Sequence, residues 1–244
     1  MKDNIKGLKF YPHSKETAIF SPEPIPASKN IPDWYKRQAG SVDEDAALAK
    51  GNSTGTIKRC MPIFDAMTAG YLLSFPMDVF VDATDPKKLT WSAPNSMMKY
   101  AGEMFAVHAE LQYDQYPVDT DVWHPQLFRI LPFWSVQTPE GFSSLVIHPL
   151  HRDNEPFKTV SGFIDTDAFS SDGHFSMHIK RGFKGIIKQG TPFAQIIPVK
   201  RESWQMTLVD DQESTEFLLR QRLNVRSRFR HSYKEKFRSK KEYK

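Results

Sequence analysis

The chain has 244 residues, of which 39% are hydrophobic, 13% aromatic and 25% charged, and its formal net charge is +4. This composition predicts one large domain, or one domain with appendages, and excludes a chain that is disordered throughout. No apolar run approaches the ~18 residues of a membrane-spanning helix, the first residues do not resemble a signal peptide, and the single Cys60 excludes an intrachain disulfide or a cysteine zinc cage.

Residues 1–56 are expected to form a proline-rich arm followed by a loop. Five prolines among the first 36 residues fix φ and remove backbone donors, which predicts an extended arm and not a helix or a central strand. Apolar side chains on the arm indicate that it lies along the body or along a neighbouring subunit. Residues 39–56 are small, polar and interrupted by Gly, which predicts a loop with one helical turn at 43–50.

Residues 57–205 have the pattern of a mainly β domain. Most apolar runs are short and end at Gly, Pro, Asp or Asn, and the stretches MDVFVDA and HFSMHIK alternate apolar with polar residues. Closely spaced short strands without amphipathic helices between them predict a jelly-roll-like barrel or a sandwich, and argue against a doubly wound sheet. Residues 95–104 and 108–120 are ambiguous.

Residues 206–244 are expected to form a basic helical tail. From 211 to 225, helix formers follow one another with acidic residues first and basic residues later, in the order that a helix dipole favours. Residues 218–244 contain 11 Lys/Arg and 2 Asp/Glu, a net charge of +9, whereas the rest of the chain contains 22 and 27, a net charge of −5.

Aromatic residues are interleaved with the basic ones in this tail. The pattern is typical of nucleic-acid binding, in which cations neutralise phosphates and rings stack on bases. An acidic protein surface, such as the body of a second copy, is an alternative partner, and a solvated helix end is the third interpretation. The residues predicted to make these contacts are Arg226, Arg228, Phe229, Arg230, Lys234, Lys236 and Arg238.

Four short motifs follow one another between residues 69 and 195. They are Ala69-Gly70-Tyr71, a Pro-Glu-Gly-Phe turn at 139–142, a strand end with two acids at 162–167, and a Gly-Thr-Pro turn leading into a strand at 190–195. In this order they resemble the dUTPase and dCTP-deaminase family of trimeric β-barrels, over residues 57–200. The resemblance implies a β-clip fold, a homotrimer, and a role for Asp165 in binding a sugar and orienting water. Further ligand-binding candidates are Tyr71, Phe142, Arg152, Asp167 and Gln195.

Several positions depart from the family's pattern. Leu72 stands where the family has an Asp, and Ala168 stands where it has a Tyr that stacks on the sugar. His-Pro-Leu-His-Arg at 148–152 replaces the phosphate-gripping Pro-Arg-Ser-Gly segment, and the Gly-rich closing tail is missing. Since phosphoryl chemistry depends on positioned positive charge, an orthodox dUTPase is not expected. Over more of its length the chain resembles an uncharacterised group of phage and bacterial proteins with IPDWY, DAxTAGY and GTPxAQxIPxKRExW segments.

Asp165 and Asp167 have two interpretations. As i and i+2 residues of a strand they face the same side, so they would form a metal-binding or acid/base pair. In a nucleotide-active enzyme, Asp165 would act with His148 or His151 as general base, and these side chains would converge across a subunit boundary. Alternatively the two aspartates are solvated strand-end acids that form a turn with Ser170 and Ser171.

A second set of side chains would suit ferrous iron. His151 and Asp153 form a His-x-Asp pair, and a later histidine, His178 or His174, completes the two-His-one-carboxylate set of oxygenases. The later histidines also fit the polar face of one strand. In addition, the aromatic-rich stretch with Trp123 and Trp134 would either line a ligand pocket or belong to the core.

Together these patterns favour a non-enzymatic, phage-type assembly or binding protein, built on a degenerate dUTPase-like barrel. It is expected to associate with itself, preferably as a trimer, and to be located in the host cytoplasm or the virion. No cofactor and no membrane association are expected. One alternative is an atypical nucleotide-binding or nucleotide-hydrolysing enzyme that uses Mg²⁺. The other is an oxygenase that uses Fe²⁺ and 2-oxoglutarate.

Overall fold

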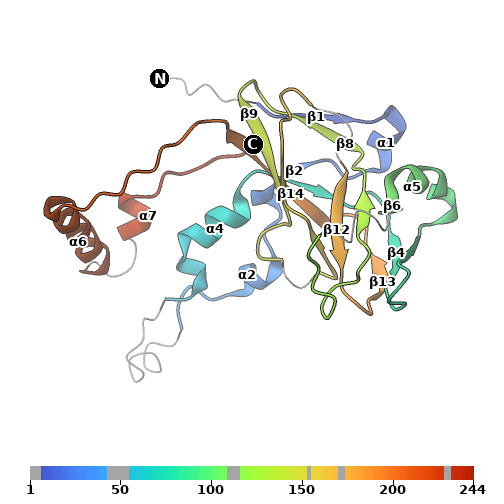
Figure 1. Ribbon diagram of the computed structural model, residues 1–244, viewed down its shortest axis with the longest axis horizontal. Helices are drawn as coiled ribbons and strands as arrows, with labels where there is room; N and C mark the ends of the chain where they lie inside the picture. Colours follow the sequence, from blue (N-terminus) through green and yellow to red (C-terminus); the bar gives the residue numbers. More distant parts are fainter. Residues whose placement is uncertain (1–6, 43–54, 109–115, 153–154, 170–173, 228–231) are drawn as a thin grey trace. The chain divides into compact units, whose positions relative to one another are not determined.

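The computed structural model (Figure 1) describes residues 7–42, 55–108, 116–152, 155–169, 174–227 and 232–244. The chain divides into two compact units. The β unit comprises Met1–Asn30 and Gly70–Arg201, and the helical unit comprises Ile31–Ala69 and Glu202–Lys244. The first 30 residues therefore belong to the same unit as the main run of strands.

The β unit confirms the predicted mainly β class. Its described strands form antiparallel sheets with the orders β11-β9-β14-β3-β2, β10-β12-β7-β6, β13-β4-β5 and β1-β8. Each of these sheets has two edge strands, so none of them closes into a barrel by itself. The strands are β1 (Lys9–Pro12), β2 (Ile25–Pro26), β3 (Tyr71–Ser74), β4 (Val79–Asp82), β5 (Thr90–Ser92), β6 (Phe105–Val107), β7 (Phe128–Ile130), β8 (Trp134–Gln137), β9 (Phe142–Ile147), β10 (Phe157–Thr159), β11 (Gly162–Ile164), β12 (Phe175–Ile179), β13 (Lys184–Ile187) and β14 (Pro192–Lys200).

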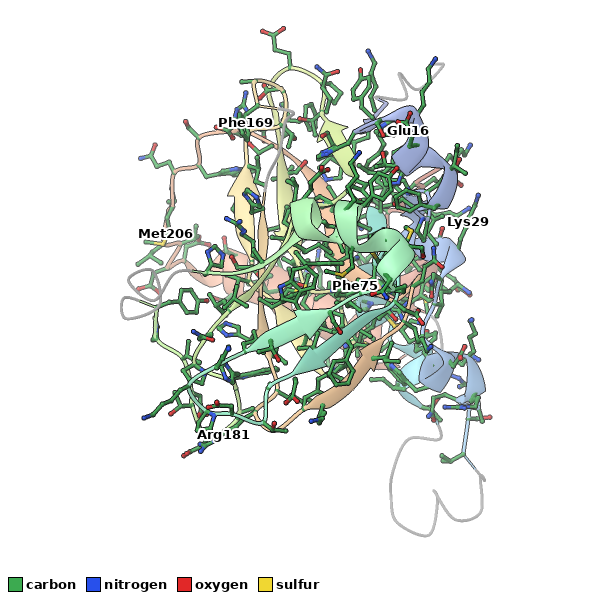
Figure 2. All side chains as sticks on the ribbon, turned by 90° about the vertical axis from the view of Figure 1, so that its right-hand side faces the viewer. Glu16, Lys29, Phe75, Phe169, Arg181 and Met206 are labelled. Atoms are coloured by element: carbon green, nitrogen blue, oxygen red, sulfur yellow. The ribbon has the colours of Figure 1, made fainter. Side chains whose placement is uncertain are left out.

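Apolar side chains from all of these sheets meet in one core. The alternation in β4 shows how the sequence directs them inward, because Val79 and Val81 are fully buried while the residues between and after them are only half-buried. Phe75 lies inside the unit (Figure 2) and packs edge-on against the rings of Phe157 and Phe193, with centroids 5.3 and 5.5 Å away. Much of the core is therefore built from phenylalanine.

Gly70 stands where the chain enters β3 beside β14. Its φ is +67°, and a Cβ at this position would lie 1.9 Å from the backbone oxygen of Ile196. Only glycine combines this left-handed conformation with so close a backbone contact. The Ala-Gly-Tyr motif thus has a packing role in this chain.

The N-terminal segment packs along the body of its own unit, as predicted, through the pairing of β1 with β8 and of β2 with β3. The expectation of a wholly extended arm is wrong, however, because α1 (Lys15–Phe20) is helical. The Ser14 hydroxyl accepts from the Thr17 N–H, and the Thr17 hydroxyl oxygen accepts from the Ser14 N–H, which forms a capping box. Pro12 and Pro22 lie on either side of this helix and do not interrupt it.

The remaining helices complete both units. The ambiguous stretch 95–104 contains the 3-10 turn Asn95–Met97 and α5 (Met98–Met104) of the β unit, which also has a 3-10 turn at Ala27–Lys29. The helical unit contains α2 (Asp33–Arg37), a 3-10 turn at Ile57–Arg59, α4 (Met61–Thr68), α6 (Gln212–Ser227) and α7 (Ser232–Lys236). The predicted helix at 211–225 is confirmed by α6. In the described part of the chain, no helix has both the length and the apolar character to cross a membrane.

Two contacts join distant segments within the helical unit. The Arg238 guanidinium grips the Asp65 carboxylate, with Nη2 2.6 Å and Nε 3.1 Å from Oδ1, and it also lies over the Phe64 ring. The Tyr35 hydroxyl donates to the backbone oxygen of Lys58 at 3.1 Å. The end of the chain is therefore tied to α4. The helical turn predicted at 43–50 lies outside the described residues.

Candidate functional site

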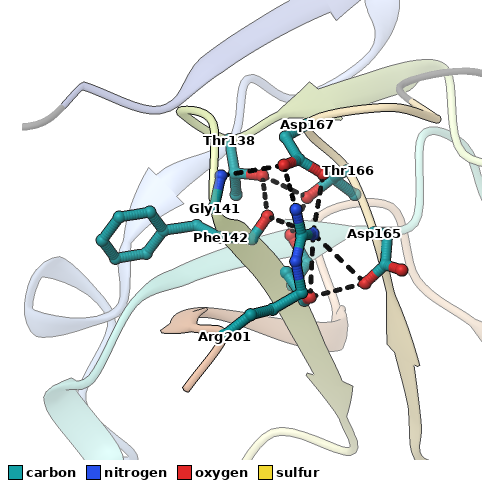
Figure 3. Close-up of polar contacts among 9 residues, drawn as sticks. Thr138, Gly141, Phe142, Asp165, Thr166, Asp167 and Arg201 are labelled. Carbon is teal, nitrogen blue, oxygen red and sulfur yellow. Dashed lines mark hydrogen bonds and ion pairs between the residues drawn. The ribbon is translucent and has the colours of Figure 1, made fainter. Parts of the chain in front are cut away.

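The strand end with two acids contacts the start of β9 (Figure 3). The antiparallel register places Ile164 opposite Ser144, so the next residue, Asp165, reaches Ser143. The Ser143 hydroxyl donates to Asp165 Oδ1 at 2.6 Å. The chain then turns, and the N–H of Phe169 donates to the backbone oxygen of Asp165 at 2.8 Å.

Arg201, directly after β14, bridges the two acids. Its Nη1 donates to Asp167 Oδ1 at 2.8 Å and lies 3.4 Å from Asp165 Oδ1, while its Nη2 pairs with Asp167 Oδ2. This guanidinium holds the pKa of the Asp167 carboxyl well below its usual range, and the same pair raises the pKa of Arg201. Asp165 follows β11 and Asp167 lies in the turn after it, so they are not i and i+2 residues of one strand, but both contact a cation of the same chain.

The turn at 139–142 is attached to this ion pair. Gly141 has a φ of +80°, and its N–H donates to Asp167 Oδ2 at 2.9 Å. Its carbonyl oxygen accepts from the Arg201 N–H at 2.8 Å. The side chain of Phe142, a predicted ligand-binding residue, points away from the acids (Figure 3).

A chain of buried hydroxyls lies beneath the acids. Thr166 is 2% exposed, and its hydroxyl is 2.8 Å from those of Thr138 and Ser144. Thr138 donates its own proton to the backbone oxygen of Phe142 at 2.7 Å, so Thr166 donates to Thr138 and Ser144 donates to Thr166. The hydroxyls of Thr138, Ser144 and Thr166 therefore all have hydrogen-bond partners, which makes this cluster rigid.

A cavity of about 550 Å³ adjoins the buried face of Asp167. This volume lies within the range of small-molecule sites. The cavity is lined by Gly7, Lys9, Gln137, Thr138, Pro139, Glu140, Asp167 and Ala168. Its lining mixes apolar and polar surface and carries charge of both signs, so it would suit a small ligand with polar groups.

Gln195 and His148 hold the loop that replaces the phosphate-gripping segment. Gln195 is 1% exposed, and its Oε1 accepts from the backbone N–H of Leu150 at 2.9 Å. His148 Nδ1 accepts from the backbone N–H of Thr159 at 3.3 Å, so the proton is on Nε2, which lies 3.3 Å from the backbone oxygen of Arg152. Both side chains thus support the backbone around them.

Within one chain, the candidate base His148 does not meet Asp165. Asp165 contacts Ser143 at the start of β9, and His148 follows the end of that strand. At about 3.3 Å per residue, the two ends are separated by about 17 Å. His151 has a left-handed φ of 61°. Arg152 donates to the side-chain and backbone oxygens of Asn30, so it anchors the end of the N-terminal segment.

The aromatic candidates have different neighbours. The Tyr71 ring packs edge-on against Phe10, with the centroids 5.4 Å apart. Trp134 packs against the core and donates from Nε1 to the Ser21 hydroxyl at 3.2 Å. Trp123 instead lies beside His178, at 5.8 Å between ring centroids. The two tryptophans thus pack against different partners.

Solved structures of dUTPases are similar to this chain. A mutant dUTPase of phage phi11 of S. aureus, described as coordinating a structural Mg(II) ion, is 11% identical, with 85% of this chain and 99% of that chain covered and a TM-score of 0.38. A mutant dUTPase of Staphylococcus bacteriophage 80alpha with dUpNHpp is 12% identical, with coverages of 85% and 90% and a TM-score of 0.36. The EIAV dUTPase is 13% identical, with coverages of 59% and 85% and a TM-score of 0.33. These structures belong to the family that the sequence motifs resemble.

No family model matches the chain, and no curated protein matches it.

The predicted metal set is incomplete in the described residues. Asp153 lies outside them, and among the residues that are described, no group of three His, Cys, Asp or Glu side chains is placed to hold a metal ion. His178 is buried on β12.

The tail candidates fall into four groups. Lys234 and Lys236 are exposed on α7, whereas Arg238 is bound to Asp65. Arg226 lies in α6. The last group, outside the described residues, is Arg228, Phe229 and Arg230.

Sequence reasoning missed Arg201, the central residue of the acidic cluster. Two neighbouring carboxylates are stabilised by a nearby cation, so the sequence could have predicted a basic partner for Asp165 and Asp167. Several basic residues were available, however, and only the pairing of β14 with β9 selects Arg201.

Proposed function

We propose that this protein is a non-enzymatic assembly protein that binds further copies of itself through its C-terminal segment. The observation that carries the proposal is a run of exposed apolar side chains after β14. Trp204, Met206 and Leu208 are 87%, 82% and 84% exposed. Clustered apolar side chains on a surface are typical of a site that a partner covers.

The order of residues in this run suits a β-strand. Trp204, Met206 and Leu208 alternate with Ser203, Gln205 and Thr207, so an extended chain would turn its apolar side chains to one face and its polar ones to the other. Such a segment can add to the edge of a sheet in a second molecule. Further apolar side chains follow on α6, all 50–63% exposed: Phe217, Leu218, Leu219 and Leu223.

Charge also supports a second copy as the partner. Residues 218–244 carry a net charge of +9 and the rest of the chain −5. Opposite charges steer association and favour the correct partner over others. A basic tail would therefore be attracted to the acidic body of another copy.

The internal contacts of the family-like motifs support a non-enzymatic role. Asp167 is paired with Arg201, Gln195 supports the Leu150 backbone, and His148 lies at the other end of β9 from Asp165. General acid–base catalysis requires a group that is within reach of substrate and free to exchange a proton. These side chains are used to support the fold instead.

The experiment is light scattering of the full chain over a range of concentrations. We expect wild type to form an oligomer of defined mass, and the variant Trp204→Ser/Met206→Ser/Leu208→Ser to be monomeric. The matched control is Ser203→Ala/Gln205→Ala/Thr207→Ala, which changes the intervening positions and is expected to keep the wild-type mass. A monomeric wild type, or equal masses for the two variants, would contradict the proposal.

A second candidate function is favoured by the cavity beside Asp167. Asp165 remains 65% exposed near this cavity, so a nucleotide sugar would reach it. A ligand that binds only the native state raises the melting temperature. A shift with dUTP, dCTP or dUMP, with or without Mg²⁺, that Asp165→Asn abolishes would support nucleotide binding. The absence of any shift would leave the assembly role as the better proposal.

A further inference from the structure

The outer face of the four-stranded sheet β10-β12-β7-β6 gathers basic and polar side chains. Register places Lys158 opposite His178 and Arg129 opposite Ser176. Ser176 and His178 are two residues apart on β12, so all four side chains share one face. The alternate residues of these strands point to the core, as the complete burial of Phe128 and Met177 shows.

Two buried polar atoms on this face lack hydrogen-bond partners. Among the described side chains that are not exposed, Arg129 Nε and His178 Nδ1 are covered and unpaired. His178 is only 8% exposed. An unpaired buried polar atom costs free energy, so a group that bonds to these atoms would be bound favourably. In native proteins such atoms often mark the place of an ion.

Two described side chains of this face carry a positive charge. Arg129 and Lys158 are cations, and burial together with the charge of Lys158 lowers the pKa of His178. Nearby, His108 Nε2 lies 2.6 Å from the Ser176 hydroxyl, which adds a further polar pair. An anion would offset the repulsion among these cations and accept hydrogen bonds from them.

Two aromatic rings flank His178. The ring centroids of Tyr116 and Trp123 lie 5.5 and 5.8 Å from that of His178, with interplanar angles of 43° and 45°. Tyr116 is 43% exposed, so a ligand from solvent can reach it. A planar ligand group would find an apolar surface here.

The geometry points to a phosphate site on this face, in which Arg129, Lys158, Ser176 and His178 bind a phosphomonoester whose ring packs against Tyr116 and Trp123. Arginine suits this role because its planar fork matches two phosphate oxygens. The site does not use Asp165 or Arg201. In Figure 2, Phe169 of the acidic cluster and Arg181, two residues after β12, lie at opposite ends of the β unit. This inference does not rest on the proposed assembly role.

The test is calorimetric titration of the full chain, at constant ionic strength, with inorganic phosphate and with phenyl phosphate. We expect saturable binding of both probes, with phenyl phosphate binding more tightly. Arg129→Gln removes one charge-assisted hydrogen bond and should raise the dissociation constant by about 10- to 100-fold. Lys158→Gln should also raise it. The matched control Lys87→Gln removes an exposed lysine from a turn, and it is expected to bind as wild type does.

A second readout separates binding from folding. Lys158 is exposed, so Lys158→Gln is expected to fold normally. In wild type, phosphate should shift the His178 ring resonances and raise the pKa of His178, and in Lys158→Gln the shift should need more phosphate. Trp123→Ala should remove the higher affinity for phenyl phosphate and leave the affinity for inorganic phosphate unchanged. No saturable binding by wild type, or wild-type affinity in both Arg129→Gln and Lys158→Gln, would overturn the inference.

Discussion

Replacing Gly70 and Gly141 with alanine, one at a time, should separate two costs of a Cβ atom: a left-handed backbone conformation and a clash with neighbouring backbone. At Gly70 a Cβ would lie 1.9 Å from the Ile196 oxygen and 2.8 Å from its carbonyl carbon. Gly141 has a similar φ of +80°, but nothing lies within 4 Å of its Cβ position. Gly141→Ala therefore reports the cost of a left-handed conformation alone, and Gly70→Ala reports that cost together with the clash.

The difference between these two variants follows from the contacts. A left-handed conformation costs a residue with a Cβ about 1–2 kcal/mol, and this applies to both variants. At Gly70 the backbones of β3 and β14 must also move apart in a closely packed core, and overpacking of this kind costs about 1–3 kcal/mol more. We therefore expect Gly70→Ala to be destabilised by about 2–5 kcal/mol in total, and Gly141→Ala by about 1–2 kcal/mol.

The assay is urea unfolding of both variants beside wild type, with the slope of the free energy against urea compared as well as the midpoint. An unchanged slope shows that the same cooperative unit unfolds. Equal destabilisation of Gly70→Ala and Gly141→Ala would refute the packing argument. It would mean that the Ala-Gly-Tyr motif has no special steric role in this chain.

Three further predictions concern polar contacts. The folded-state pKa of Asp167 is lowered, so its ionised form stabilises the protein above the unfolded pKa of about 3.9, and this contribution is lost as the pH falls further. Asp167→Asn should therefore reduce the free energy of unfolding at neutral pH and weaken its dependence on pH below neutral. An unchanged pH dependence in urea unfolding would count against the ion pair. Thr166→Val leaves two buried hydroxyls with a lost partner and should cost about 1–3 kcal/mol in the same assay, whereas the exposed control Thr90→Val should change stability by less than about 0.5 kcal/mol. Arg238→Gln should release the C-terminal residues from Asp65 and speed their removal by a protease, while the β unit stays intact; unchanged cleavage would show that the pair does not hold the end of the chain.

The local patterns of the sequence were sufficient for most of the secondary structure. Alternation of apolar and polar residues predicted β4 and β12, and burial follows this period of two in β4, whereas in β12 the polar His178 is buried as well. The run of helix formers predicted α6. The prolines predicted an arm without a helix, yet α1 forms within it. They lie outside the segment that Ser14 and Thr17 cap.

For the candidate site, the sequence predicted the residues that lie close together along the chain, but not the contacts between distant residues. Strand geometry predicted a shared side for Asp165 and Asp167, but β11 ends at Ile164, and the two acids contact one guanidinium from the turn that follows. The convergence of His148 or His151 with Asp165 is predicted across a subunit boundary and stays a prediction, because within one chain β9 separates His148 from Asp165. In the same way, Arg129 and Lys158 belong to one face of a sheet only through the register of β12 with its two neighbours.

The sequence by itself thus determined the mainly β class, the helix at the C-terminal end, the turns at glycine and the contrast between an acidic body and a basic tail. These properties depend on backbone preferences and on charges that are counted locally. The tertiary structure alone decided which cation pairs with which carboxylate, which strands are neighbours and which polar atoms are buried without partners. Such pairings join residues that are tens of positions apart, and their energy depends on burial and distance, which local patterns do not specify.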